Sequence, residues 1–400
     1  MLVIFLLTIS LLAYWMIEFN RHQRILRTIP IRIHVNGTRG KSSVTRLIAA
    51  GLRAGGKKTL AKTTGTLPRI IDENGLEIPV PRPHGVNIIE QLDIVRFMNR
   101  RSPEVIVLEC MAVLPQFQWI CEHQMVKSTV GVFTNSRLDH VREMGPSIEN
   151  ITRSLCNTLP KNGIAFTSEK KNLPLMLREA EKLNTKLSRV ASRAVENDEM
   201  ANFSYIEHKA NVALALAVCE HLGVERKTAL KGMYDAHPDA GAMNIYQLQK
   251  GETQVFFISA LAANDPESTL EIWRALDEIH QDRSHLTVML NTRADRFDRS
   301  IQLLEICQAH IPFDELVFIG EKLEQVVSNA IRLKIRRDKF VLIKSKSPEE
   351  AFNRIIESAP PTGKMLVFAI GNMGGGGLQV ANYFKKQANN IENCANIAPH

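Results

Sequence analysis

The chain has 400 residues, of which 44% are hydrophobic and 23% are charged, a composition expected of a globular protein with more than one domain. Its formal net charge of +8 suits anionic partners, but aromatic residues make up only 6%, and no aromatic and basic cluster indicates a nucleic-acid-binding module. The six cysteines are scattered without a C-x-x-C pair, so we expect unpaired thiols in a reducing compartment and no zinc site.

The N-terminus is an uncharged apolar run, MLVIFLLTISLLAYWMI over residues 1–17, just long enough to cross a bilayer as a helix. Tyr14 and Trp15 lie near its end, where an aromatic belt would lie, and four arginines follow between residues 21 and 32. A secretory signal peptide would carry its positive charge before the apolar run and small residues at a cleavage site. We therefore expect a single-pass anchor helix over residues 1–20 in the cell membrane, with the remaining chain in the cytoplasm. The alternative is a buried N-terminal helix.

Short apolar strands then alternate with helical patterns along the chain. Near-continuous apolar runs are typical of buried parallel strands. The expected strands lie at residues 29–35, 105–109, 129–134, 254–259, 285–290, 315–320, 339–343 and 364–370. Helical spacing of apolar residues is clearest at residues 42–54 and 207–222. This alternation predicts an α/β fold with doubly wound sheets.

One segment, residues 235–251, lacks clear periodicity and contains Pro238, Gly241 and Gly251. We place the boundary between two domains there. The expected domains cover residues 30–245 and 250–390.

The most informative stretch is IRIHVNGTRGKSSVTRL, in which an expected strand runs into a Gly-rich turn that ends in Gly-Lys-Ser and opens a helix. Successive N–H groups of such a turn form a cradle for phosphate, the lysine neutralises phosphate charge, and the next hydroxyl can hold Mg²⁺. The loop is shorter than the usual eight-residue form, because Val35 stands where its first glycine would be and Gly37 lies four residues before Lys41. An ordinary Gly-containing turn is the alternative.

Four further groups of residues follow in the first half of the chain. KTTGT begins at Lys62 and is rich in hydroxyls, and Glu109 ends a buried strand, where α/β sheets place ligand groups. FTNSRLDH contains His140, which the preceding aspartate could orient in the manner of a metal-bound imidazole. EHKANVALALAVCEHLG carries Asn211 near the start of an Ala-rich helix. Taken singly these groups also fit a plain turn, a salt-bridged glutamate, a surface pair and a core helix.

Together, GTRGKSS, TTGT, VLE, NSRLDH and HKANVALALA resemble the motifs of the Mur ligase superfamily, in the order of its ATPase domain. The resemblance implies a P-loop-type ATPase domain, a C-terminal Rossmann-like domain, and use of ATP and Mg²⁺ to join a carboxylate to an amine through an acyl phosphate. It implies catalysis by Lys41, Glu109 and His140 and metal binding by Ser42, Glu109 and His140. It implies ATP binding by Gly37, Thr38, Arg39, Gly40, Lys41, Ser42, Ser43 and Asn211.

The sequence departs from parts of that superfamily. The loop begins by residue 37, which leaves no room for the N-terminal UDP-sugar domain of muramyl-peptide ligases. Folylpolyglutamate synthases also start at this loop, but they have no membrane anchor. Some members carry a modified, metal-bridging lysine about fifteen residues after the histidine, where this chain has Thr152, Arg153 and Ser154. We therefore expect that site to be absent, which leaves the number of metal ions open.

The full length is most similar to the ligase subunits of poly-γ-glutamate synthases, the PgsB/CapB type. The hydrophobic N-terminus, the GTRGKSSVTRLI loop, ALAANDP, NTRADR and GNMGGGG carry this similarity. It implies that glutamate and a growing γ-linked chain are the substrates and that small membrane subunits are the partners. The low aromatic content gives no reason to expect nucleic acid as a partner. A homo-oligomer stays open.

The second half offers candidates for binding the acidic substrate. NTRADRFDRS follows a strand and supplies Arg293, Arg296 and Arg299, whose guanidinium groups bind carboxylates in bidentate fashion. GNMGGGG also follows a strand, and the N–H groups around Gly374 and Gly375 could converge on an anion. The predicted substrate residues are Thr64, Asp265, Arg293, Arg296, Gly374 and Gly375. A helix N-cap for the aspartate, a solvated charged loop and a flexible glycine loop are the alternatives.

Two other functions stay open at this stage. A non-enzymatic nucleotide switch in a membrane complex would keep the phosphate loop but would have no need of an arginine-rich second domain. A ligase for another amino acid or for a folate-like acceptor would share most of the motifs. Glutamate-dependent ATP turnover distinguishes the switch from the ligase.

Overall fold

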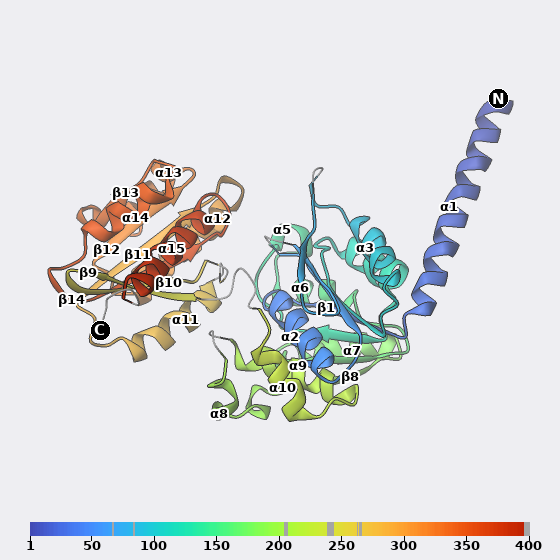
Figure 1. The fold of residues 1–400 in the computed structure, drawn as a ribbon. Helices are drawn as coiled ribbons and strands as arrows, with labels where there is room; N and C mark the ends of the chain where they lie inside the picture. Colours follow the sequence, from blue (N-terminus) through green and yellow to red (C-terminus); the bar gives the residue numbers. More distant parts are fainter. Residues whose placement is uncertain are drawn as a thin grey trace. The chain divides into compact units, whose positions relative to one another are not determined.

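The structure, a computed structural model, describes residues 1–65, 68–82, 85–203, 207–237, 244–261, 263 and 266–395. The chain forms two compact units, residues 1–239 and residues 240–400, which are described separately here (Figure 1). The mixed α/β class expected from the sequence is confirmed, since each unit contains one sheet flanked by helices.

Unit 1 contains an eight-stranded sheet with the order β4-β3-β2-β5-β1-β6-β7-β8. Its strands are β1 (Ile31–Asn36), β2 (Thr59–Thr63), β3 (Arg69–Ile71), β4 (Glu77–Pro79), β5 (Val105–Glu109), β6 (Val130–Phe133), β7 (Ile164–Thr167) and β8 (Lys186–Arg189). Six strands run parallel, whereas β3 and β4 form an antiparallel hairpin at one edge. The carboxyl ends of β1, β2, β5 and β6 therefore share one edge, where a ligand site is expected in such a sheet.

The helices of unit 1 cover both faces of this sheet. They are α1 (Leu2–Thr28), α2 (Lys41–Ala54), α3 (Glu90–Asn99), α4 (Pro115–Ile120), the π-helix η1 (Cys121–Val126), α5 (Val141–Met144), α6 (Ile148–Cys156), α7 (Leu173–Lys182), the 3-10 helix η2 (Ser192–Ala194), α8 (Asn197–Met200), α9 (Lys209–His221) and α10 (Arg226–Tyr234). Strand β5 shows why both faces are covered: Val105 and Val107 pack in the core with α2, α9 and α10, whereas Ile106 and Leu108 pack with α3. All four side chains are fully buried, so the strand reads as a continuous apolar run.

Unit 2 contains a six-stranded sheet with the order β13-β12-β11-β14-β10-β9. Its strands are β9 (Asn244–Lys250), β10 (Glu252–Ser259), β11 (His285–Thr292), β12 (Glu315–Gly320), β13 (Phe340–Leu342) and β14 (Thr362–Gly371). Its helices are α11 (Pro266–Ile279), η3 (Ala294–Arg296), α12 (Phe297–His310), α13 (Leu323–Arg332), η4 (Arg337–Lys339), α14 (Pro348–Glu357) and α15 (Gly377–Ala395). One core lies under α11, α12 and α13, and a second lies under α14 and α15 on the opposite face.

The sequence analysis missed two antiparallel features. It assigned no strand to residues 244–250, yet β9 pairs with β10 along the edge of the second sheet. Only Leu248 of β9 is buried, so the strand has little apolar alternation to reveal it. The β3–β4 hairpin was also unforeseen, because its three-residue strands are too short to show a period.

Candidate functional site

The phosphate-binding loop lies between β1 and α2, and its two outer glycines are required by its geometry. Gly37 and Gly40 have φ angles of +134° and +81°, which side-chain-bearing residues rarely adopt. A Cβ atom on Gly37 would lie 2.0 Å from Oγ1 of Thr134, and one on Gly40 would lie 2.7 Å from Oδ1 of Asn211. The loop therefore keeps a backbone-lined cradle at the N-terminus of α2, which fits a phosphate group.

Lys41 is the first residue of α2, and its side chain folds back over this cradle. Its Nζ atom donates to the carbonyl oxygens of Gly37 at 2.8 Å and Thr38 at 3.4 Å. Both partners are neutral carbonyl oxygens, which a phosphate could replace as a charged acceptor.

Asn135, which follows β6, holds the loop from the other side. The backbone N–H of Thr38 donates to the Asn135 carbonyl at 3.0 Å, and the Thr38 hydroxyl donates to its Oδ1 at 2.7 Å. The N–H of Arg39 also donates to Oδ1, at 3.2 Å. No role was predicted for this asparagine of FTNSRLDH, although it lies shortly after a buried strand, where ligand groups are expected.

Glu109 joins three of the expected site segments. Its Oε2 atom accepts the Ser42 hydroxyl at 2.8 Å and the backbone N–H of Thr64 at 2.7 Å, and the residue is only 3% exposed. The three come from the start of α2, the turn after β2 and the end of β5, which are adjacent at the sheet edge. A hydroxyl and a carboxylate in contact below a phosphate cradle are the ligand types that Mg²⁺ prefers, so the donor set fits this cation.

A buried network continues from Thr64 to Lys62, whose side chain is fully buried. Lys62 Nζ lies 2.9 Å from Glu90 Oε1, and both oxygens of Glu90 accept from Arg82, at 2.6 and 3.0 Å. Arg82 also donates to the Thr64 carbonyl at 3.2 Å. Burial lowers the pKa of Lys62 against the opposing effect of Glu90. Both backbone polar groups of Thr64 are thus fixed, its N–H by Glu109 and its carbonyl by Arg82.

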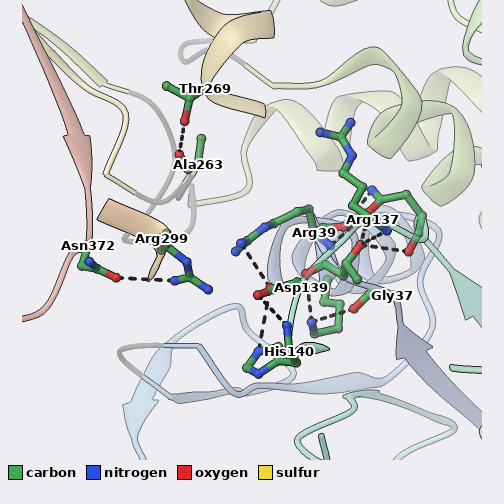
Figure 2. A network of polar contacts seen from close by, with 12 residues as sticks. Gly37, Arg39, Arg137, Asp139, His140, Ala263, Thr269, Arg299 and Asn372 are labelled. Atoms are coloured by element: carbon green, nitrogen blue, oxygen red, sulfur yellow. Dashed lines mark hydrogen bonds and ion pairs between the residues drawn. The ribbon is translucent and has the colours of Figure 1, made fainter. Parts of the chain in front are cut away.

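Asp139 links the loop to His140 (Figure 2). Its Oδ2 atom lies 3.1 Å from Arg39 Nη2 and 3.8 Å from His140 Nε2, and its side chain is 8% exposed. His140 adopts a left-handed conformation, with φ of +50°, at the start of α5, and its Nδ1 lies 3.7 Å from Glu143. The aspartate therefore contacts the histidine, whereas a place for His140 beside Ser42 and Glu109 stays a prediction. Within the described ranges no group of three or more His, Cys, Asp and Glu side chains is arranged to hold a metal.

A second buried pair involves His34, which lies within β1. His34 Nδ1 lies 2.8 Å from Oε2 of Glu122 on η1, and both side chains are 1% exposed. The backbone N–H and the hydroxyl of Ser128 both donate to the other carboxylate oxygen at 2.8 Å. Burial by itself lowers the pKa of His34, but hydrogen bonds with Cys110 and Glu122 outweigh it and raise the pKa to about 10.

The remaining predicted residues lie as follows. Asn211, 7% exposed, packs against Gly40 and donates to Glu207 at 2.9 Å, and Ser43 lies in the first turn of α2. Asp265 lies outside the described residues.

In unit 2 the structure brings Arg293 and the glycine turn together. They follow β11 and β14, which are parallel neighbours. A Cβ atom on Gly374 would lie 3.0 Å from Arg293 Nη1, and one on Gly375 would lie 3.0 Å from its Cγ, so the arginine lies over the turn. Arg293 and Arg296 both lie beside Asp295, with N–O distances of 2.8 and 3.9 Å.

Buried asparagine side chains hold the loops at the same edge of unit 2 in place. Asn291, which sequence reasoning missed, donates from Nδ2 to the carbonyls of Gly374, at 2.7 Å, and Asn372. Asn372 Oδ1 in turn accepts from Arg299 at 3.4 Å (Figure 2). The glycine turn is therefore fixed from beneath.

Comparison with known families agrees with this arrangement. A model of the Mur ligase middle domain matches residues 35–237, and a model of the poly-gamma-glutamate synthase CapB C-terminal domain matches residues 245–387. The chain is 35% identical over 373 residues to the capsule biosynthesis protein CapB of Bacillus anthracis, covering 92% of this chain and 79% of that protein. It is 34% identical over 367 residues to PGA synthase CapB of Bacillus subtilis (strain 168), covering 91% and 93%.

Solved structures share the fold at lower identity. Escherichia coli FolC in complex with ADP superposes with a TM-score of 0.68 at 16% identity, covering 92% of each chain. Mycobacterium tuberculosis folylpolyglutamate synthase, complexed with ADP and AMPPCP, gives 0.66 at 17% identity, covering 92% of this chain and 93% of that chain.

Proposed function

This chain belongs to the poly-γ-glutamate synthase CapB family of Mur-type ligases, and we propose that it uses ATP to lengthen poly-γ-glutamate through amide bonds. The observation that carries the proposal is the contact of Ser42 and Thr64 with Glu109 directly below the glycine cradle. A phosphate site and a cation site at one sheet edge are what a phosphoryl-transfer step requires.

A carboxylate is a poor acyl donor because its oxygen is a poor leaving group. Transfer of the γ-phosphoryl group of ATP to the γ-carboxylate would make phosphate the leaving group, and the amine of the next glutamate would then displace it. Lys41 would neutralise charge on the transferring phosphoryl group, as the loop N–H groups would on its oxygens. Mg²⁺, held by Ser42 and Glu109, would supply further positive charge there. His140, oriented by Asp139, is proposed as a third group of this centre.

The acidic substrate fits the edge of unit 2. Arg293 lies over the Gly374–Gly375 turn, so a guanidinium fork and backbone N–H groups are available to the same carboxylate. The polymer is a polyanion, and the net charge of +8 favours its approach. We assign substrate binding to this edge, with Arg296 beside it.

Residues 2–17 are proposed to anchor the enzyme in the cell membrane with both units in the cytoplasm. In the part of the chain that the structure describes, α1 is the one helix long and apolar enough to cross a bilayer. Small membrane subunits are the proposed partners, and an anchored synthase could pass its product to an export pore.

The test is synthesis in a defined system. The full chain in nanodiscs, supplied with ATP, Mg²⁺ and labelled glutamate, should yield an acid-precipitable labelled polymer and glutamate-dependent ATP hydrolysis. Hydrolysis without glutamate dependence would favour a nucleotide switch. Product with a folate acceptor and none with glutamate would favour a folylpolyglutamate-type ligase.

A further inference from the structure

Helix α1 runs without interruption through two different surroundings. Figure 1 shows its N-terminal part extending away from the rest of unit 1. The apolar residues 2–17 are exposed, whereas His22 and Leu26 are buried. Because an α-helix rises 1.5 Å per residue, Ile17 and His22 are about 8 Å apart along the axis. The anchor and the folded unit are thus joined by little more than one helical turn, with no linker between them.

Polar contacts fix the last turns of α1 to η1. His22 Nε2 lies 2.7 Å from the Met125 carbonyl oxygen, and Gln23 donates to the Gln124 carbonyl at 3.1 Å. The guanidinium of Arg32 joins both helix ends: it donates to Ile29 O at 2.6 Å on one side and to Lys127 O at 2.9 Å on the other. The anchor therefore holds unit 1 in a fixed orientation.

The surface around this junction is basic. Its exposed cations, which we call the basic face, are Arg21, Arg24, Arg27 and Lys127. Lys127 Nζ lies 6.0 Å from the ring centre of Phe19, which places this cation beside the turn just outside the apolar segment. The neighbouring acidic side chains Glu18 and Asp93 both pair with Arg96, and Glu18 reaches Arg21 only at 4.0 Å. The basic face is therefore largely uncompensated.

We propose that the basic face binds the headgroups of anionic phospholipids, so that unit 1 rests on the bilayer surface. The proposal rests on the membrane anchoring proposed above for residues 2–17. The face begins within about 8 Å of the apolar segment, which is one Debye length at physiological salt, so the surface potential reaches it. Each cation near such a surface favours the bound orientation by roughly fivefold.

The test measures the distance of unit 1 from the headgroups. Full-length protein carrying Cys394→Ser and Asp93→Cys receives a dye at position 93, since Cys110, Cys121, Cys156, Cys219 and Cys307 are all buried. It is placed in phosphatidylcholine nanodiscs with or without phosphatidylglycerol, doped with a headgroup-linked quencher. We expect stronger quenching with phosphatidylglycerol at low salt, and a return to the neutral-lipid value at high salt.

Neutralising the basic face should remove the difference between the lipids. The combined variant Arg21→Gln, Arg24→Gln, Arg27→Gln and Lys127→Gln should show equal quenching on both. Lys127→Gln alone should lower the ratio of protein with a quenched dye to protein with an unquenched dye by roughly fivefold. Residue 127 lies too far along the chain from α1 for this substitution to alter insertion of the helix. The matched control replaces four exposed cations of unit 2 by glutamine: Arg332, Lys334, Arg336 and Arg337. It should keep the wild-type difference.

Three results would overturn the proposal. They are equal quenching of the wild type on both lipids, no quenching while the protein stays in the disc, and quenching in native membranes alone, which would indicate a membrane-protein partner at this face. Failure to enter the disc would refute the anchor itself. Glutamate incorporation on the same discs reports separately on the ligase activity.

Discussion

The Ser42 hydroxyl donates to Glu109 Oε2 at 2.8 Å, and this hydrogen bond joins the first turn of α2 to the carboxyl end of β5. The same oxygen also holds the N–H of Thr64, so one carboxylate fixes the relative positions of the phosphate loop and the next turn. The Ser42 hydroxyl and the Glu109 carboxylate are oxygen donors of the kind that Mg²⁺ takes, and they would hold such a cation here.

Glu109→Gln should lower ATP turnover by on the order of 100-fold, because the amide keeps the shape of the side chain but loses the charge that would hold Mg²⁺. Steady-state rates of ATP hydrolysis at varied Mg²⁺ measure this loss, and the Mg²⁺ concentration needed for half-maximal turnover should rise in the variant. Glu324→Gln is the control, since that side chain is 82% exposed. Wild-type Mg²⁺ dependence in the folded Glu109→Gln variant would exclude this carboxylate as a ligand.

Lys41→Met should abolish ATP turnover while the protein stays folded. Within the residues that the structure describes, the lysine ammonium donates to two loop carbonyls and pairs with no acid, so its loss leaves no buried acid unpaired. Hydrolysis assays combined with circular dichroism separate the two effects. Normal turnover in the folded variant would remove the loop from the mechanism.

Substitutions of Glu90 and of Lys62 in the buried network should lower the free energy of unfolding by different amounts. Glu90→Gln leaves Lys62 and Arg82 without their shared anion and should cost about 3 kcal/mol of unfolding free energy. Lys62→Met should cost less, because Glu90 keeps its two bonds from Arg82. Urea titration in detergent measures both. Equal losses would mean that the lysine, not the arginine, is the main partner.

Stability should depend on pH through His34. Its pKa in the folded protein, about 10, exceeds the ordinary value of 6.5. The stabilisation is therefore complete below pH 6.5 and is lost as the pH rises toward 10, by at most about 1.4 kcal/mol per unit. Melting temperatures of the wild type should fall over this window more than those of His34→Gln. Exposed His310→Gln, as control, should follow the wild type.

Arg293→Ala should weaken use of glutamate or of the growing chain and leave ATP binding largely intact. The side chain lies over the Gly374–Gly375 turn in unit 2, whereas the phosphate cradle belongs to unit 1. The KM for glutamate and the Kd for a non-hydrolysable ATP analogue measure the two effects, with exposed Arg336→Ala as control. Loss of nucleotide affinity with unchanged glutamate dependence would make Arg293 a nucleotide ligand instead.

Most site segments of unit 1 could be predicted from the sequence because they lie at the carboxyl ends of strands. The Gly-Lys-Ser turn follows β1, the TTGT segment begins at the last residue of β2, and Glu109 is the last residue of β5. Parallel strands bring such residues to one edge of the sheet. Bounds of β5 and β12 match the expected ranges because their buried runs end in polar or glycine residues.

Other features depend on partners far along the chain. A lysine in a hydroxyl-rich turn is ordinarily solvated, and the burial of Lys62 requires Glu90, 28 residues later, at the start of α3. The side chains of Asn135 and Asn291 bond to backbone N–H and carbonyl groups. Every residue type has such groups, so the sequence does not identify these partners. Their roles could be seen only once the loops they hold were in place.

Helix α1 also determines where the chain can be shortened for work without detergent. The apolar run ends at Ile17, and a cut after residue 20 follows naturally from the sequence. Leu26 and Ile29 nevertheless belong to the core that includes Val95 and Met98, and His22 is 3% exposed. A water-soluble version of this protein should therefore begin at Glu18, which keeps its ion pair with Arg96, because a later start loses this pair and soon removes part of the interior along with the anchor.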